Sequence, residues 1–201
     1  RIVRALCDFP PPCPISDLAA QAKVDISYAS RLVEWLSREA LLERRPRGPV
    51  ESVDKASLIR RWAQDYEVLT SNDARAYLDP RGVDNLVRTL SGGAFGGRYA
   101  LTGSIAANRI SPIAPAHLAM LYVDDVGSAA TALKIRPTEA GANVMLLVPF
   151  DDVVFVRTWQ DGGLTIVALS QAAVDLMTGP GRAPSEAEAI LERLAGNVSS
   201  R

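Results

Sequence analysis

One segment of this 201-residue chain limits the possible folds more than any other: SYASRLVEWLSREALL, residues 27–42. Its apolar residues recur at intervals of three and four, as on the buried face of an amphipathic helix; they are Ala29, Leu32, Val33, Leu36 and Ala40. Just before it, ISDLAAQAKV predicts a helix of about two turns that is capped by Ser16. Little more than VDI separates the two, so Ser27 is expected to cap the second helix. The sequence therefore predicts two helices joined by a tight turn.

Three further segments complete the first part of the chain. RIVRALCD, at the N-terminus, predicts a short helix that FPPPCP ends, because proline lacks the amide hydrogen and disfavours a helical residue before it. LLERRPRGPVESV predicts two short strands around a turn rich in Pro and Gly. DKASLIRRWAQDY predicts another helix, capped by Asp54. This order predicts a winged helix-turn-helix domain over residues 1–66, with residues 27–42 as recognition helix and the hairpin as wing.

The recognition helix has a polar face opposite its apolar stripe, at about 100° of rotation per residue. This face and the hairpin tip supply the candidate DNA-binding residues: Ser27, Tyr28, Ser30, Arg31, Arg38, Arg44, Arg45 and Arg47. Tyr28, Ser30 and Arg31 are expected to read base edges in the major groove. The three hairpin arginines are expected to project from the tip and to contact phosphates. Glu34 lies on the same polar face.

The distribution of charge favours DNA as the partner of the first part of the chain. Residues 1–66 hold 11 basic and 9 acidic residues, a net charge of +2, and the remainder holds 11 basic and 14 acidic residues, a net charge of −3. A concentrated positive patch, such as the five arginines between residues 31 and 47, attracts a phosphate backbone. Two other interpretations stay open: an exposed run of arginines is often only a solvated face, and winged helices also serve as protein-interaction modules.

The remainder, residues 67–201, predicts a mixed α/β domain, so the whole chain is expected to be α+β. Residues 67–75 lose helical periodicity and indicate a short linker. Buried strands are predicted for AHLAMLYVD and ANVMLLVPF, and a hairpin for DVVFVRTW and LTIVAL around QDGG. Helices are predicted for DPRGVDNLVRTL, for DVGSAATALK, for SQAAVDLMT with Ser170 as its cap, and for APSEAEAILERLAG.

No cofactor or metal is expected. The glycine-rich residues 91–97 lack the spacing of a phosphate-binding loop and predict a flexible connection. Cys7 and Cys13 are too few for a structural zinc site and are expected to be reduced thiols. His117 is the single histidine, has no distinctive partner in sequence, and is expected to be a packed or loop residue.

Paired aspartates raise an enzymatic alternative. In LYVDDV, Asp124 and Asp125 follow an aromatic residue, as the acids at the metal-binding turn of reverse transcriptases do, and Asp151 and Asp152 repeat the pair. If these four carboxylates met, they could form the metal site of a nuclease or nucleotidyltransferase that the winged helix targets to DNA. The simpler interpretation is that Asp124 and Asp125, at the end of a strand, cap the helix that follows, and that Asp151 and Asp152 are acids at another strand boundary. The chain is small for a polymerase, and we expect it not to be an enzyme.

The sequence contains no run of about 18 apolar residues and no signal-peptide pattern, which predicts a cytoplasmic protein that does not span a membrane. The chain begins at Arg1 inside an expected helix, so we expect the natural N-terminus to lie further upstream.

Three strings follow the expected winged helix in order: RYALTGSIAANRISPIAP, LYVDDV and LLVPFDDVVFVRTWQDGGLTIVALSQAAVDLMTGPGRAPSEAEAILERL. Over most of residues 16–195 the chain thereby resembles antitoxins of AbiEi-type (type IV) toxin–antitoxin systems. The resemblance implies that the winged helix binds double-stranded operator DNA with repeats and represses its own operon. It also implies that the C-terminal domain counteracts a nucleotidyltransferase-like toxin, and it brings no catalytic residues.

Overall fold

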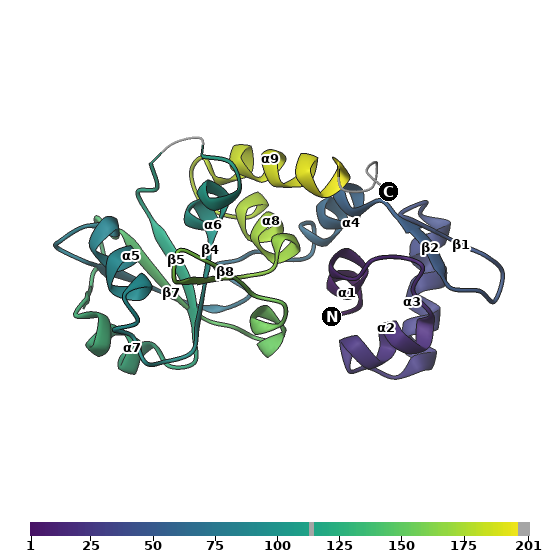
Figure 1. Ribbon diagram of the computed structural model, residues 1–201, viewed down its shortest axis with the longest axis horizontal. Helices are drawn as coiled ribbons and strands as arrows, with labels where there is room; N and C mark the ends of the chain where they lie inside the picture. Colours follow the sequence, from purple (N-terminus) through teal and green to yellow (C-terminus); the bar gives the residue numbers. More distant parts are fainter. Residues whose placement is uncertain (113–114, 197–201) are drawn as a thin grey trace. The chain divides into compact units, whose positions relative to one another are not determined.

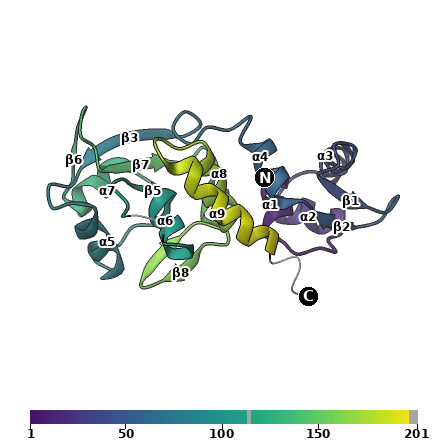
Figure 2. The same cartoon turned by 90° about the horizontal axis from the view of Figure 1, so that it is seen from above.

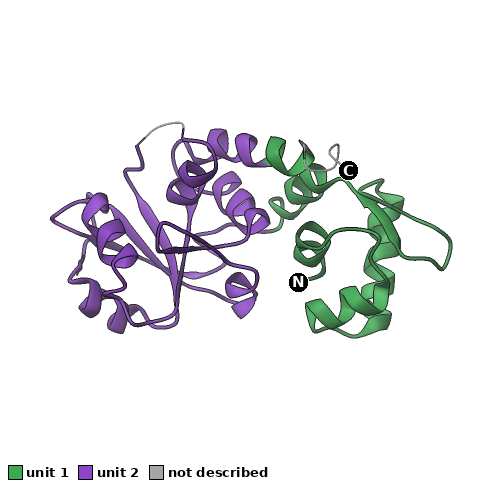
Figure 3. Ribbon diagram, in the orientation of Figure 1, with its two compact units in different colours: residues 1–65, 191–201 green, residues 66–190 purple. Residues whose placement is uncertain are grey.

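The computed structural model describes residues 1–112 and 115–196 and divides into two compact units (Figure 3). The first unit comprises residues 1–65 and 191–201, and the second comprises residues 66–190. The chain is α+β, as predicted. Of the expected C-terminal domain, residues 113–114 and 197–201 lie outside the described residues. No helix within the described ranges combines the length and the apolar character that crossing a membrane requires.

Helices form the core of the first unit, and a hairpin lies between the third and the fourth of them along the chain (Figure 1). Its elements are α1 (Ile2–Asp8), α2 (Ile15–Ala22), α3 (Ile26–Arg38), β1 (Leu42–Arg44), β2 (Val50–Val53) and α4 (Lys55–Trp62). α1 packs against α2 and α4, and α2 packs against α3. The largest fully buried apolar side chains of this core are Ile2, Leu6, Leu18, Leu36, Leu58 and Ile59. Burial of this apolar surface stabilises the unit, because isolated helices of seven or eight residues are marginal in water.

The hairpin pairs β1 and β2 antiparallel, with a break in register between Glu43 and Arg44. Cys13 adds a bridge to this small sheet, since its amide and carbonyl exchange hydrogen bonds of 2.9 Å with Val50. Cys7 and Cys13 are both free and buried, and burial raises the pKa of both thiols.

The predicted helix boundaries of this unit need correction. α2 begins after Pro14 rather than with Ser16 as its cap. α3 is capped by Asp25, not Ser27, and it ends at Arg38. Ala40 then has a φ of 56°, and the amide of Leu41 donates to the carbonyl of Leu36, a left-handed helix end that turns the chain toward β1. Ala40 is therefore exposed outside the helix. The cap of α4 is Asp54, as predicted.

The second unit is built on a seven-stranded mixed sheet (Figures 1 and 2). Its strands are β3 (Asp73–Leu78), β4 (Tyr99–Thr102), β5 (Ala119–Val123), β6 (Arg136–Pro137), β7 (Val144–Val148), β8 (Trp159–Asp161) and β9 (Leu164–Ile166). Its helices are α5 (Val83–Ser91), α6 (Gly103–Ile110), α7 (Val126–Leu133), the 3-10 helix η1 (Asp152–Phe155) and α8 (Leu169–Met177). α9 (Ala183–Gly196) starts in this unit and continues past the division at residue 191.

The strand order is β6-β3-β7-β5-β4-β9-β8. β5 pairs parallel with β7, and β4 pairs parallel with β9, whereas the other pairs are antiparallel. All five residues of β5 are buried, in agreement with the predicted apolar strand. α6 and α8 pack against each other and against β4, which explains why the segments before β5 and after β9 are rich in alanine.

Several sequence predictions for this unit need correction. The predicted linker over residues 67–75 extends at most to residue 72, because β3 begins at Asp73. The glycine-rich stretch is followed at once by β4 and α6, which the sequence analysis did not predict. DVVFVRTW is not a continuous strand: Asp151 caps the 3-10 helix η1, and only Trp159 begins the pairing with β9. α8 is preceded by Ala168 and has no side-chain cap, and Ser170 is buried inside it.

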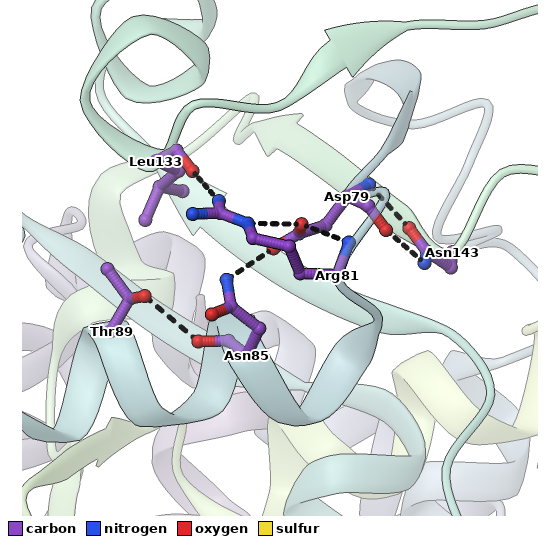
Figure 4. Close-up of polar contacts among 6 residues, drawn as sticks. All are labelled: Asp79, Arg81, Asn85, Thr89, Leu133 and Asn143. Carbon is purple, nitrogen blue, oxygen red and sulfur yellow. Dashed lines mark hydrogen bonds and ion pairs between the residues drawn. The ribbon is translucent and has the colours of Figure 1, made fainter.

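The start of α5 is held by one buried carboxylate, that of Asp79 (Figure 4). It accepts hydrogen bonds from the amide and Nε of Arg81 at 2.9 and 3.1 Å and from Nδ2 of Asn85 at 2.9 Å. Asn143 exchanges two further hydrogen bonds with the backbone of Asp79. Burial alone would raise the pKa of Asp79, but the hydrogen bonds from Arg81 and Asn85 outweigh it and hold that pKa below its usual value.

A polar cluster lies inside the core of the second unit, around Asp175 of α8. Its carboxylate accepts hydrogen bonds from Tyr66 and Tyr122 at 2.9 Å each, from Gln171 at 2.8 Å and from Thr102 at 2.7 Å. Burial raises the pKa of Asp175 to about 6, although all four donors act in the opposite direction. This cluster could not be predicted from the sequence, because its members are far apart along the chain.

Candidate nucleic-acid interface

The first turn of α3 presents the residues expected to read bases. Asp25 caps it by accepting hydrogen bonds from the amides of Ser27 and Tyr28, at 2.8 and 3.2 Å. These two hydrogen bonds, the one from Tyr28 foremost, hold the pKa of Asp25 below its usual value. The capped turn exposes the side chains of Ile26 and Tyr28, which are 52% and 49% accessible. An aromatic ring that is half-exposed at a helix start is available to an external partner.

The rest of α3 follows the predicted division into two faces. Ala29, Val33 and Leu36 are buried, and Leu32 is half-buried. Ser27, Arg31 and Arg38 are exposed, and Ser30 is half-buried. The helix therefore carries the candidate side chains on its solvent side, with Ser30 closest to the core face.

Glu34 joins the helix to the hairpin through two arginines. One oxygen of its carboxylate accepts a hydrogen bond from Nη2 of Arg38 at 3.2 Å, and the other lies 3.9 Å from Nη1 of Arg44. The Arg44 side chain is only 12% exposed, and its Nη1 is buried without a hydrogen-bond acceptor among the described residues. The prediction that Arg44 projects from the hairpin tip was wrong, because Arg44 is the last residue of β1 and its side chain is covered.

Arg45 and Arg47 occupy the hairpin turn itself. The Arg45 side chain is 77% exposed, and its Nε lies 2.6 Å from a carboxylate oxygen of Glu51. Arg47 is exposed with a φ of 59°, and no ion pair of its side chain, or of Arg31, occurs within residues 1–112 and 115–196. These two arginines at the turn, with Arg31 and Arg38 on α3, form the exposed basic side chains of the interface.

The paired aspartates separate into two structural roles. Asp125 caps α7 by accepting from the amide of Ser128 at 2.7 Å, which confirms its predicted role. Asp151 caps η1 by accepting from the amide of Val153 at 3.0 Å, in a segment that was predicted as a strand. Asp124 and Asp152 instead bind the guanidinium group of Arg98, whose Nε lies 2.8 Å from Asp124 and whose Nη2 lies 3.3 Å from Asp152. An arginine thus stands where a cation shared by these two acids would bind. The described part of the chain contains no group of three or more acids, histidines or cysteines that could hold a metal ion.

A pocket of about 590 Å3 in the second unit was not foreseen from the sequence. The start of α5, the end of α6 and residues 115–117 line it, and the exposed His117 belongs to its wall. Its two arginines are already paired, Arg81 with Asp79 and Arg109 with Asp161, each at 3.1 Å. Both charges are offset, whereas at α3 and the hairpin the side chains of Arg31 and Arg47 form no ion pair among the described residues.

What the sequence analysis missed at the interface is the pairing of its arginines with Glu34 and Glu51. A signal for the Glu34–Arg38 pair was present, since the two residues stand four positions apart on one helix.

In comparisons with protein-family models, with curated proteins and with solved structures, nothing matches this chain.

Proposed function

We propose that the first unit is a winged helix-turn-helix that binds double-stranded DNA, with α3 as recognition helix and the β1–β2 hairpin as wing. One observation carries the proposal: an exposed helix face with Tyr28, Arg31 and Arg38 belongs to the same compact unit as a turn with Arg45 and Arg47. A helix fits the major groove, and arginines on an adjacent hairpin reach the phosphates that border it.

In this proposal the protein is a cytoplasmic transcriptional regulator of the antitoxin type, without catalytic activity. It represses its own operon and counteracts a nucleotidyltransferase-like toxin. The toxin part of the proposal rests on the resemblance of residues 16–195 to AbiEi-type antitoxins. The charge difference between residues 1–66 and the remainder supports assigning DNA to the first part and a protein partner to the second.

DNA binding is tested by fluorescence anisotropy of the full chain with the duplex upstream of its own gene and with a random duplex, over a series of salt concentrations. Binding should weaken steeply with salt, and the upstream duplex should bind more tightly. A chain that binds neither duplex at low salt would rule out the proposal.

The two-part role is tested with the variant R31A/R45A/R47A. This variant should lose binding to the upstream duplex and still rescue cells that express a nucleotidyltransferase-like toxin encoded beside this gene. The matched control is R75A/R88A/R136A, three exposed arginines of the second unit, which should bind DNA as the wild type does. Loss of rescue together with loss of DNA binding would contradict the assignment of the two roles to different units.

A further inference from the structure

Glu34 occupies the centre of the exposed face of α3. It follows Arg31 by three residues and precedes Arg38 by four, so the three side chains share one side of the helix. The Glu34 side chain is half-exposed, and it is held from two directions, by Arg38 of the same helix and by Arg44 at the end of β1. The carboxylate therefore has a hydrogen-bond donor on its own helix and a second positive charge 3.9 Å away, while half of the side chain faces solvent.

A carboxylate at this place opposes binding to DNA in general. Phosphates repel it, and its pairing with Arg38 and Arg44 diverts their positive charge from the DNA backbone. A protein selected only for affinity to DNA would gain from a neutral residue here. Such an acid is advantageous where it distinguishes one sequence from the others, since specificity requires a cost against wrong partners.

The chemistry of the groove narrows what a carboxylate can recognise. An ionised carboxylate only accepts hydrogen bonds. In the major groove, the bases that present a donor are cytosine, with N4, and adenine, with N6 beside the acceptor N7. Because N7 repels a second acceptor, cytosine is the better match for a glutamate, and adenine is the better match for a glutamine.

We infer that Glu34 is a specificity-determining residue whose carboxylate accepts a hydrogen bond from N4 of a cytosine in the major groove and weakens binding to sequences without that base. The inference rests on the proposed DNA binding by α3. Arg38 and Arg44 offset the charge of Glu34 against the bordering phosphates, which allows the carboxylate to approach a base edge at a tolerable cost.

The test is selection of bound duplexes from a randomised pool with the full chain, as wild type, E34Q, E34A and E39Q. The wild type should select sites with a cytosine at one position. E34A should lose this preference, and E34Q should select adenine at the same position. E39Q removes the same charge just beyond α3, where the exposed Glu39 makes no side-chain ion pair within the described residues, and it should keep the cytosine. In anisotropy, E34A should bind random duplex more tightly and lose on the order of tenfold in preference for the selected site.

The outcomes separate this inference from the proposed function. If the wild type binds no duplex, the proposed function fails and the role of Glu34 fails with it. If the wild type binds but selects no cytosine position, or if E34A and E34Q keep that cytosine, only the role of Glu34 is overturned. Thermal melting of each variant checks the fold, and the isosteric E34Q serves as the test even if E34A melts early.

Discussion

The hydroxyl of Tyr122 donates a hydrogen bond of 2.9 Å to Asp175, while the same hydroxyl lies 3.0 Å from that of Tyr66, which also donates to Asp175. Each hydroxyl has one hydrogen. When both hydrogens point at an ionised Asp175, the contact between the two tyrosine oxygens has no hydrogen of its own. A proton on Asp175 removes this conflict, because the carboxyl group then donates to one tyrosine, which is free to donate to the other. Burial and the contact between the two tyrosine oxygens thus favour the neutral acid, whereas the four hydrogen bonds to the carboxylate favour its ionised form.

The first prediction is that wild-type stability falls between about pH 4 and pH 6. Burial raises the pKa of Asp175 to about 6 from an ordinary value of 3.8, so the folded state holds this proton more tightly than the unfolded state. The contribution of this proton to the free energy of unfolding is then fully present below pH 4. It is lost as the pH rises through 6, which lowers the free energy of unfolding by about 3 kcal/mol. Urea denaturation across this range measures it. D175N should show a flatter profile there, and an unchanged slope in D175N would assign the effect to another group.

The second prediction concerns the partner hydroxyl. Y122F should lower the free energy of unfolding at neutral pH by about 1–3 kcal/mol, because the ionised Asp175 loses a buried donor. The matched control is Y99F, which removes a half-buried hydroxyl that accepts a 3.3 Å hydrogen bond from the amide of Thr165, and its cost should be smaller. Equal losses in the two variants would show that the cluster around Asp175 has no special weight.

The third prediction separates the hairpin arginines by their burial. R45A and R47A should each weaken binding to all duplexes alike and reduce the slope of log affinity against log salt by about one. R44A should instead destabilise the fold, because the Arg44 side chain is largely buried and its removal takes away the packing of its aliphatic carbons. Anisotropy over a salt series and thermal melting measure the two effects. A salt slope unaffected by the double change R45A/R47A would contradict phosphate contact at the turn.

The fourth prediction is that R31A relaxes base preference. As an exposed residue near the start of α3, Arg31 is placed to contact a base edge, and its loss should cost about 1–3 kcal/mol on the preferred duplex. The loss on random duplex should be smaller. R60A, a change of another exposed arginine of the first unit, is the control and should leave preference intact. Equal losses of R31A on both duplexes would place Arg31 at the backbone instead.

The fifth prediction tests the cap of α3. D25A should lower the melting temperature and weaken DNA binding, since the amides of Ser27 and Tyr28 lose their acceptor where Tyr28 is displayed. D25N should retain most of the melting temperature and of the DNA affinity, because asparagine caps helices nearly as well as aspartate does. The pKa of Asp25 is lowered in the fold, so this contribution is present above pH 4 and is lost as the pH falls below it. A D25A variant that melts and binds like wild type would exclude the capping role.

Sequence patterns were sufficient for the elements with a clear apolar signal. The stripe of Ala29, Val33 and Leu36 was predicted from its spacing, and the fully buried β5 was predicted from its apolar composition. The starts of α4 and α7 at Asp54 and Asp125 were also predicted, but those of α2 and α3 were not, because aspartate, serine and a preceding proline compete for the same position and only backbone geometry decides among them. The cap of α3 therefore moved from Ser27 to Asp25.

Interactions between distant segments explain the remaining differences. DVVFVRTW has the composition of a strand, but Asp151 caps a 3-10 turn that uses the first residues of this segment. From the sequence alone, Arg44 was expected at the hairpin tip. The strand register instead places it in β1, and its side chain lies near Glu34 of α3. The Asp175 cluster joins residues up to 109 positions apart, a separation at which local patterns carry no information.

The ends of the large sheet have a consequence for the behaviour of the chain at high concentration. Its outermost strands are β6, two residues long and containing Pro137, and β8, three residues long. Proline offers no amide hydrogen, and so short a border gives an incoming chain few backbone groups to pair with. Continued β-pairing of copies onto β6 or β8 is therefore disfavoured, so this unit is expected to recognise other proteins mainly through side-chain surfaces.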